Sequence, residues 1–478
     1  MAHMLLTPLL NADFQKTMRL RNNAVPGAHH IKGEILMIRG LAAFFSKIVR
    51  RWLPDAFLFA AILTFIVFIF GMIFQGQTPV AMVKYWGEGF WKLLAFAMQM
   101  VLVLVTGHTL AKTKVVESFL KSIASVAKTP SQAIMVTTFV ALIACWVNWG
   151  FGLIVGALLA REMVQKVKGV HYGLLVASAY TGFIVWHAGL SGSIPLKVAD
   201  AKGFMAKITG GMQIPVSETI FAWQNLLICV ILLVSLPIIN KMMMPREEDV
   251  VEADPALFAD EHVEVPLKPR SEMTPAEKLE NSMVVSMLLG AMGFGYILYY
   301  FANGGKLGLN SVNLIFLFAG IILHKTPANY LRVMNDAIKN TGGIVLQFPL
   351  YAGIMGMMVH SGLAASISQW FVEVSTPTTF PFFTYLSAGI VNFFVPSGGG
   401  QWAVQGPIVM PAAQQLGVPL GKAAMAIAWG DAWTNMIQPF WALPLLGIAG
   451  LTIRDIMGYC TVALIWGGVV TCTVLMFL

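Results

Sequence analysis

Long apolar runs are the feature of this sequence that most restricts its fold. Stretches of about 20 mostly apolar residues recur from residue 55 to the C-terminus. A helix of about 20 residues crosses the roughly 30 Å hydrocarbon core of a bilayer. Only 11% of the residues are charged, whereas soluble domains carry about 25%. These properties exclude a water-soluble fold and predict an all-α integral membrane protein.

The basic residues predict membrane topology rather than a nucleic-acid partner. The net charge is +8, but Lys and Arg lie mainly in short segments beside the apolar runs. Lys47, Arg50 and Arg51 precede the first run, which predicts a cytoplasmic N-terminus. The first 35 residues have no continuous apolar core typical of a cleavable signal peptide, and we expect the bacterial inner membrane.

The apolar runs predict about nine transmembrane helices. They cover roughly residues 55–74, 92–111, 172–190, 220–243, 282–301, 309–324, 340–360, 420–447 and 455–478. Two further runs, 131–160 and 380–418, are interrupted by Asn148-Trp149-Gly150-Phe151-Gly152 and by Pro396-Ser397-Gly398-Gly399-Gly400. We interpret both as re-entrant helical hairpins, the first entering from the cytoplasm and the second from outside. Irregular backbone is tolerated at membrane depth only inside protein or beside a cavity, so both tips are candidate sites.

Matching residues in the two halves predict an inverted repeat. Thr78-Pro79 matches Thr326-Pro327, Asn148 matches Asn392, and the spacing of all matches stays between 244 and 249 residues. An odd number of helices between the halves gives them opposite orientation. The predicted organisation is an N-terminal extension outside the fold (1–36), a first repeat (37–244), a cytoplasmic linker (245–281), a linking transmembrane helix (282–303) and a second repeat (304–478).

The hairpin tips and the polar breaks in the spans that follow them form the predicted substrate site. Glycine permits close backbone approach, amide side chains both donate and accept hydrogen bonds, and successive N–H groups can hold an anion. The alternative is a set of helix breaks whose polar groups only satisfy each other. The predicted substrate-binding residues are Asn148, Trp149, Gly150, Gly152, Ser191, Ser193, Asn392, Ser397, Gly398, Gly399, Gly400, Gln401, Thr434 and Asn435.

Two ionisable residues within the spans are predicted to couple transport to an ion. Asp431 is the carboxylate placed deep within the spans of the second half, and His187 lies at the matching break of the first half. Asp431 could instead be a buried hydrogen-bond partner, and His187 could merely pack. We favour H⁺ over Na⁺ as the coupling ion, because a monocarboxylate needs one compensating charge.

Longer motifs resemble the short-chain fatty acid uptake family of bacterial transporters from Met37 to the C-terminus. They are Arg51-Trp52-Leu53-Pro54-Asp55, Val147-Asn148-Trp149-Gly150-Phe151-Gly152, His324-Lys325-Thr326-Pro327, Val395-Pro396-Ser397-Gly398-Gly399-Gly400 and Ile453-Arg454-Asp455-Ile456-Met457-Gly458-Tyr459. The resemblance implies uptake of carboxylates such as butyrate or acetoacetate. It also implies an elevator in which the hairpins move against the scaffold of a homodimer in the lipid.

Three other functions compete with cation symport of short-chain fatty acids. The chain could carry another small carboxylate, such as a di- or tricarboxylate, or conduct carboxylates passively. A channel would need a continuous polar pore, whereas the polar residues gather at two opposed breaks. A membrane enzyme would need catalytic or metal-ligand spacing, which we do not find; we expect no catalytic residue, no metal site and no cofactor.

Overall fold

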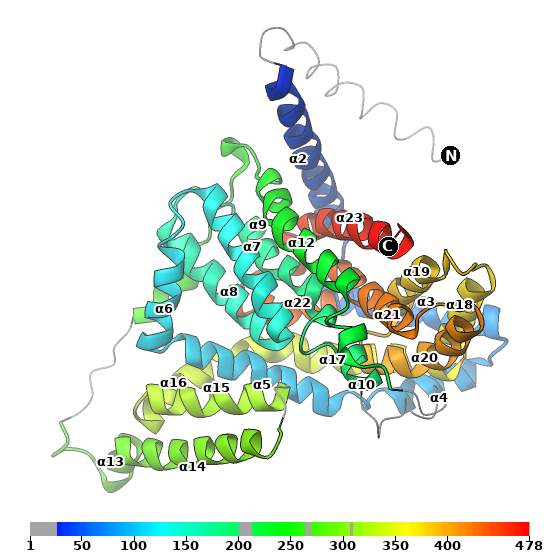
Figure 1. The fold of residues 1–478 in the computed structure, drawn as a ribbon. Helices are drawn as coiled ribbons and strands as arrows, with labels where there is room; N and C mark the ends of the chain where they lie inside the picture. The colour runs from blue at the N-terminus through cyan, green and yellow to red at the C-terminus, as the bar shows by residue number, and fades with distance from the viewer. Residues whose placement is uncertain (1–25, 200–212, 263–268, 306–308, 478) are drawn as a thin grey trace.

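The computed structural model describes residues 26–199, 213–262, 269–305 and 309–477, and these residues form helices joined by turns and loops (Figure 1). The α-helices are α2 (Pro26–Trp52), α3 (Ala56–Gln75), α4 (Pro79–Gly89), α5 (Leu94–Ala111), α6 (Lys114–Ala124), α7 (Pro130–Val147), α8 (Trp149–Lys166), α9 (Tyr172–Thr181), α10 (Ser193–Val198), α12 (Trp223–Met242), α13 (Pro275–Glu280), α14 (Met283–Ala302), α15 (Leu309–Leu323), α16 (Pro327–Ile338), α17 (Gly342–His360), α18 (Leu363–Glu373), α19 (Phe380–Phe394), α20 (Gly398–Gln415), α21 (Leu420–Thr434), α22 (Pro439–Ala449) and α23 (Ile453–Phe477). Short 3₁₀ turns are η2 (Gly182–Ala188), η3 (Val216–Glu218), η4 (Glu247–Asp249), η5 (Pro255–His262), η6 (Lys339–Thr341) and η7 (Asn435–Ile437).

Among the described residues, eight helices are long and apolar enough to cross a membrane, which makes the chain a multi-pass membrane protein. All but one lie where the sequence predicts a transmembrane helix. The exception is α7, which the sequence predicts to be one arm of a hairpin. Three predicted spans have a different form: α15 has only 15 residues, the 172–190 run is divided into α9 and η2, and the 420–447 run is divided into α21, η7 and α22.

Threonine followed by proline begins several of these helices. Thr78, Thr129 and Thr326 each occupy the N-cap position, and each side chain accepts a hydrogen bond from the first helical turn. The proline that follows fixes φ near the helical value and has no N–H to leave unpaired. The matched pairs Thr78-Pro79 and Thr326-Pro327 therefore have the same local task, which is to begin α4 and α16.

The most enclosed part of the molecule is a pair of interrupted segments. We call α9, η2 and α10 the first broken segment, and α21, η7 and α22 the second broken segment. In the apolar 18-residue stretch within Tyr172–Val198, 94% of the residues are buried. The corresponding stretch within Ala56–Gln75 has only 22% of its residues buried. Backbone that leaves the α-helical pattern thus lies inside protein, while a regular apolar helix such as α3 is left to face lipid.

Helices at the periphery surround this centre. α14 packs against α15, which packs against α5, and α17 packs against α3, α4 and α5. Figure 1 shows α14 at one edge of the molecule and α2 projecting from the opposite side. The hydrophilic segment after Met244 packs on the ends of central helices: Arg161 of α8 donates to the carbonyls of Leu257 (3.1 Å) and Ile448 (2.9 Å).

Candidate functional site

The first hairpin consists of α7 and α8, which are separated by Asn148 alone. Asn148 has extended backbone (φ −155°, ψ 122°), and its Oδ1 accepts a hydrogen bond of 3.0 Å from the N–H of Phe151. It is therefore the N-cap of α8. A Cβ on Gly152 would lie 2.4 Å from the backbone nitrogen of Cys145, so glycine lets the two arms approach.

The first broken segment closes this tip. The N–H of Trp149 donates to Oγ of Ser191 (3.0 Å), and the N–H of Leu190 donates to the carbonyl of Trp146 (2.8 Å). A Cβ on Gly189 would lie 2.0 Å from that same carbonyl oxygen. The first tip and the first broken segment therefore pack as one unit. Backbone groups that are not paired within a helix at the tip make hydrogen bonds to the broken segment.

The second hairpin consists of α19 and α20, which are joined by Val395, Pro396 and Ser397. Ser397 has nearly the same backbone as Asn148 (φ −152°, ψ 106°), and its Oγ accepts from the N–H of Gly400 at 3.2 Å. By position and task, Ser397 is thus the counterpart of Asn148. Sequence matching pairs Asn148 with Asn392 instead, but Asn392 lies further back, within α19.

Asn392 joins the second hairpin to the second broken segment. Its Nδ2 donates to the carbonyl of Asp431 (2.8 Å) and to Oγ1 of Thr434 (2.9 Å). Its Oδ1 is buried and has no hydrogen-bond partner among the described residues. The side chain is fully buried, so this oxygen is an acceptor left available inside the protein.

The second broken segment is also bonded to the first. Oδ1 of Asn435 accepts from Nε1 of Trp186 (2.8 Å), and the carbonyl of Asn435 accepts from the hydroxyl of Tyr180 (2.6 Å). Nε2 of Gln438 donates to the carbonyl of Asn392 (3.0 Å). Gln438 is absent from the predicted site; its place in the polar run before Pro439 is the signal that could have found it.

The centre of the site is a contact between His187 and Asp431. Nδ1 of His187 lies 2.9 Å from Oδ2 of Asp431, and both side chains are completely buried. The N–H of Ile194 donates to Nε2 of His187 (3.0 Å). Because Nε2 accepts, the proton of a neutral imidazole belongs on Nδ1, the ring nitrogen that contacts the carboxylate.

The carboxylate of Asp431 is otherwise unpartnered. Oδ2 of Asp431 is close to Nδ1 of His187 but is not aligned with its N–H, so the two groups are at ion-pair distance without forming a hydrogen bond. Neither carboxylate oxygen makes a hydrogen bond to any other described residue. The sequence predicts these two residues as equivalent breaks in separate halves. The structure brings them into direct contact.

The second tip lies directly on this pair. A Cβ on Gly398 would lie 2.6 Å from Cε1 of His187 and 3.0 Å from Oδ2 of Asp431. The first tip reaches the pair through aromatic rings: Trp149 lies 6.0 Å from Trp186, whose ring stacks on His187 at 4.0 Å between centroids. Both tips and both broken segments therefore meet around one ionisable pair.

Some predicted residues lie away from the pair or serve the hairpins themselves. Nε2 of Gln401 donates to the carbonyl of Ala388, which ties α20 to α19, and to Oε1 of Gln405 within α20. Gly150 and Gly152 lie in the buried first turn of α8, and Ser193 begins α10 without a hydrogen bond that caps the helix. These residues support the site rather than form its centre.

Comparison with known proteins identifies the family. The family model for the short chain fatty acid transporter matches residues 37–478. A protein of Escherichia coli (strain K12) is 49% identical over 435 residues, covering 91% of this chain and 98% of its own. A protein of Haemophilus influenzae is 46% identical over 436 residues, covering 90% and 97%. Both are provisionally named short-chain fatty acid transporters.

The chain belongs to the short-chain fatty acid transporter family. The resemblance predicted from its motifs is confirmed, including the start of the match at Met37. Two solved structures of transporters are more distantly similar. YdaH of Alcanivorax borkumensis has a TM-score of 0.43 and 15% identity over 88% of this chain and 98% of its own, and MtrF of Neisseria gonorrhoeae has 0.36 and 13% over 91% and 97%.

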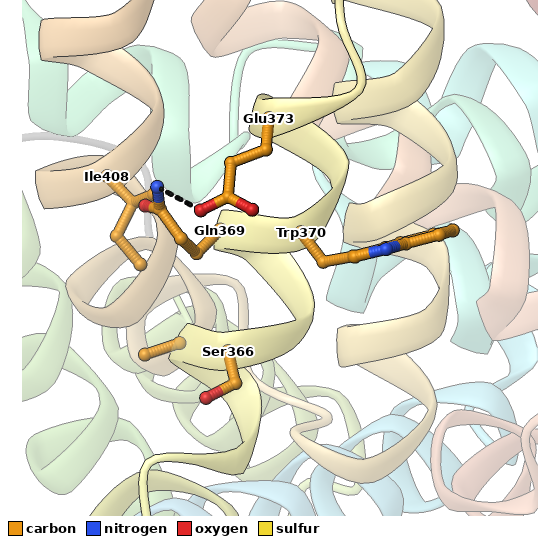
Figure 2. A pocket seen from close by; sticks show the side chains of 6 residues that line it. Ser366, Gln369, Trp370, Glu373 and Ile408 are labelled. Atoms are coloured by element: carbon orange, nitrogen blue, oxygen red, sulfur yellow. Dashed lines mark hydrogen bonds between the residues drawn. The ribbon is translucent and has the colours of Figure 1, made fainter.

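One cavity of this short-chain fatty acid transporter family member lies apart from the pair. This open cavity of about 410 Å³ lies between α18 and α20, and it is lined by Ala365, Ser366, Gln369, Trp370, Glu373 and Ile408. Figure 2 shows Gln369 donating to Glu373 along its wall. None of the predicted site residues lines it, while His187 and Asp431 have no exposed surface. The structure therefore has the central pair closed off from water.

Proposed function

We propose that this family member is a secondary active transporter that carries short-chain fatty acids such as butyrate or acetoacetate across the bacterial inner membrane together with a cation. The observation that supports this most is the enclosed His187–Asp431 contact beneath the second tip. A buried carboxylate without a full set of partners is unfavourable in a membrane protein and is by default a functional group. The carboxylate of Asp431 is close enough to the second tip for its charge to act on a substrate bound there.

The coupling ion in this proposal is a proton. Neutral His187 with ionised Asp431 carries one negative charge, and a single added proton makes the pair neutral. Moving a substrate anion with one proton transfers no net charge across the membrane. Na⁺ is the alternative, because the oxygens of Asp431 and Oδ1 of Asn392 have no hydrogen bond to a described residue and are ligands that hard cations prefer.

We further propose that the two halves are an inverted repeat that works by an elevator movement within a homodimer, with the N-terminus in the cytoplasm. Polar bonds join both hairpins and both broken segments, which favours their movement as one body. Their contact with α5 and α17 includes stacked aromatic rings: the ring of Phe440 in α22 lies 4.0 Å from that of Phe348 in α17 and 6.4 Å from that of Phe96 in α5. Aromatic rings can slide past one another without breaking hydrogen bonds, which suits movement of the broken segments along α5 and α17.

Uptake of labelled butyrate into proteoliposomes tests the transport proposal. We expect saturable accumulation of butyrate above its external concentration when a proton gradient directed inward is imposed. We expect no accumulation with an Na⁺ gradient alone. Accumulation with Na⁺ alone would replace the proton by Na⁺. Linear flux without either gradient would favour a passive channel, and stronger competition by succinate or citrate than by acetoacetate would favour a different carboxylate.

Cysteine labelling tests the inverted orientation. Single cysteines introduced at Ser122 of α6 and at Ser375 after α18, in a background without the four native cysteines, should react from opposite sides of the membrane. The first site should react from the cytoplasm. Reaction of both from one side would contradict the inverted repeat. Glu264, in the predicted cytoplasmic linker, lies outside the described residues.

A further inference from the structure

A lysine that the predicted site does not include lies at the second tip. Lys197 belongs to α10, which packs against α20 and α21. A Cβ on Gly399 would lie 2.4 Å from Nζ of Lys197, so the ammonium group sits against the first turn of α20. Lys197 has exposed surface, unlike the enclosed side chains of His187 and Asp431.

Two positive groups converge at this point. The N-terminus of a helix carries a partial charge of roughly +0.5, and a lysine adds a full positive charge. The first N–H groups of a helix have no intrahelical acceptor, and Oγ of Ser397 caps only that of Gly400. This leaves the N–H groups of Gly398 and Gly399 beside an ammonium group that has no ion pair with a described residue.

A second feature points into the same place. Oδ2 of Asp431 is fully buried, lacks a hydrogen bond to any described residue, and lies 3.0 Å from the Cβ position of Gly398. His187 borders the same glycine. Of the other elements packed on α21, α20 and η7 carry no ionisable side chain and α19 carries only Tyr385, whereas α23 carries Arg454, Asp455, Tyr459, Cys460 and Cys472. An anion at the tip would thus have Lys197 on one side and the ionisable pair on the other.

We propose that Lys197, together with the N–H groups of Gly398 and Gly399, binds the carboxylate of the transported fatty acid. This inference rests on the proposed transport function and adds the residue that supplies the countercharge. Lysine and backbone N–H groups favour an anion over a neutral molecule of the same shape. The adjacent pair makes binding depend on the proton, because ionised Asp431 beside neutral His187 repels the carboxylate while the protonated pair does not.

Uptake kinetics of labelled butyrate in proteoliposomes test this role. Lys197→Gln should raise the KM for butyrate by about tenfold or more, with a smaller change in the maximal rate, because the lost charge acts on binding. Lys197→Arg keeps the charge and should restore the KM to within about threefold. Lys422→Gln is the matched control, since it removes a partly buried lysine from the far end of α21 and should leave the KM unchanged.

A second variant serves if Lys197→Gln is not produced in folded form. Gly399→Ala places a methyl group against the flexible end of Lys197, so it should displace the ammonium group without disturbing backbone packing, and it should also raise the KM. Butyramide should inhibit the parent protein far less than butyrate, and Lys197→Gln should reduce that difference.

The outcomes separate the two proposals. An unchanged KM in both Lys197→Gln and Gly399→Ala, with saturable uptake in the parent, would overturn the role of Lys197 and assign it to contact with water or lipid headgroups. Absence of butyrate uptake in the parent protein would instead contradict the proposed function.

Discussion

The two hairpin tips share a backbone design but differ in what they leave available. Asn148 and Ser397 have almost the same extended conformation, and each caps the helix that follows it. At the first tip, Ser191 and the carbonyl of Trp146 complete hydrogen bonds with the neighbouring broken segment. At the second tip, the neighbouring polar atoms include Oδ2 of Asp431, which has no hydrogen bond to a described residue.

This difference indicates a division of tasks. Groups that satisfy each other fix a geometry, whereas buried groups without partners favour a ligand or a proton that completes them. We therefore assign the first tip to holding the first broken segment, and with it His187, in place. The second tip presents glycine backbone to the pair and, in our proposal, to the substrate. Substitutions at the two tips should accordingly damage different properties.

The largest expected effect is that of Asp431→Asn. A neutral amide cannot exchange the coupling proton, so uphill uptake of butyrate under an imposed pH gradient should be lost. Exchange of internal for external butyrate should persist, because it needs no net proton movement. The two are measured in the same proteoliposomes. Unchanged accumulation in Asp431→Asn would show that this carboxylate does not couple transport to protons.

The next effect compares Asn392→Ala with Asn148→Ala. Asn392→Ala removes hydrogen bonds to Asp431 and Thr434 in a desolvated site, which should cost about 1 to 3 kcal/mol of stability and lower uptake per folded protein by about tenfold or more. From sequence alone the same loss is expected for Asn148→Ala. Because Asn148 caps α8, we now expect that variant to lose about 1 kcal/mol of stability and to retain more transport.

Asn148→Ser is the control for this comparison, because serine is also a good N-cap and should recover the stability. Initial uptake rates and the apparent Tm of each purified variant are measured together. Equal loss of uptake in the two alanine variants at unchanged Tm would remove the distinction between the tips.

Much of this arrangement follows from the sequence, and the reasons for the rest are physical. Apolar runs locate the spans because lipid imposes their length, and glycine with Asn or Ser marks the tips because only such backbone can turn there. α4 and α18 have 11 residues each, too few to span a bilayer and to be found by hydropathy. The contact of His187 with Asp431 depends on how two distant segments pack, and no local pattern encodes it.

A smaller effect is expected for Ser191→Ala at the first tip. The N–H of Trp149 loses its acceptor in a largely buried place, which should cost about 1 to 3 kcal/mol of stability. Uptake per folded protein should stay within about twofold, because Ser191 holds the tip rather than the substrate in our interpretation. The measurements are apparent Tm and the KM for butyrate. A raised KM at unchanged Tm would return Ser191 to the predicted substrate-binding residues.

The smallest effects are expected at two N-cap threonines that have the same role in the two halves. Thr78 and Thr326 cap α4 and α16, each followed by proline, and each Oγ1 accepts one N–H of the first turn. Thr78→Ala and Thr326→Ala should each lower stability by about 1 kcal/mol and leave the KM for butyrate unchanged. Thr→Ser at either position should restore most of the loss, because the hydroxyl acceptor is kept. We expect the two cap variants to shift the apparent Tm equally, whereas the variants of Asn148 and Asn392 should differ in uptake. Together these results would show that the functional difference between the halves lies at the hairpin tips. A change in KM for one cap variant alone would extend that difference to the peripheral helices and weaken the assignment of substrate binding to the second tip.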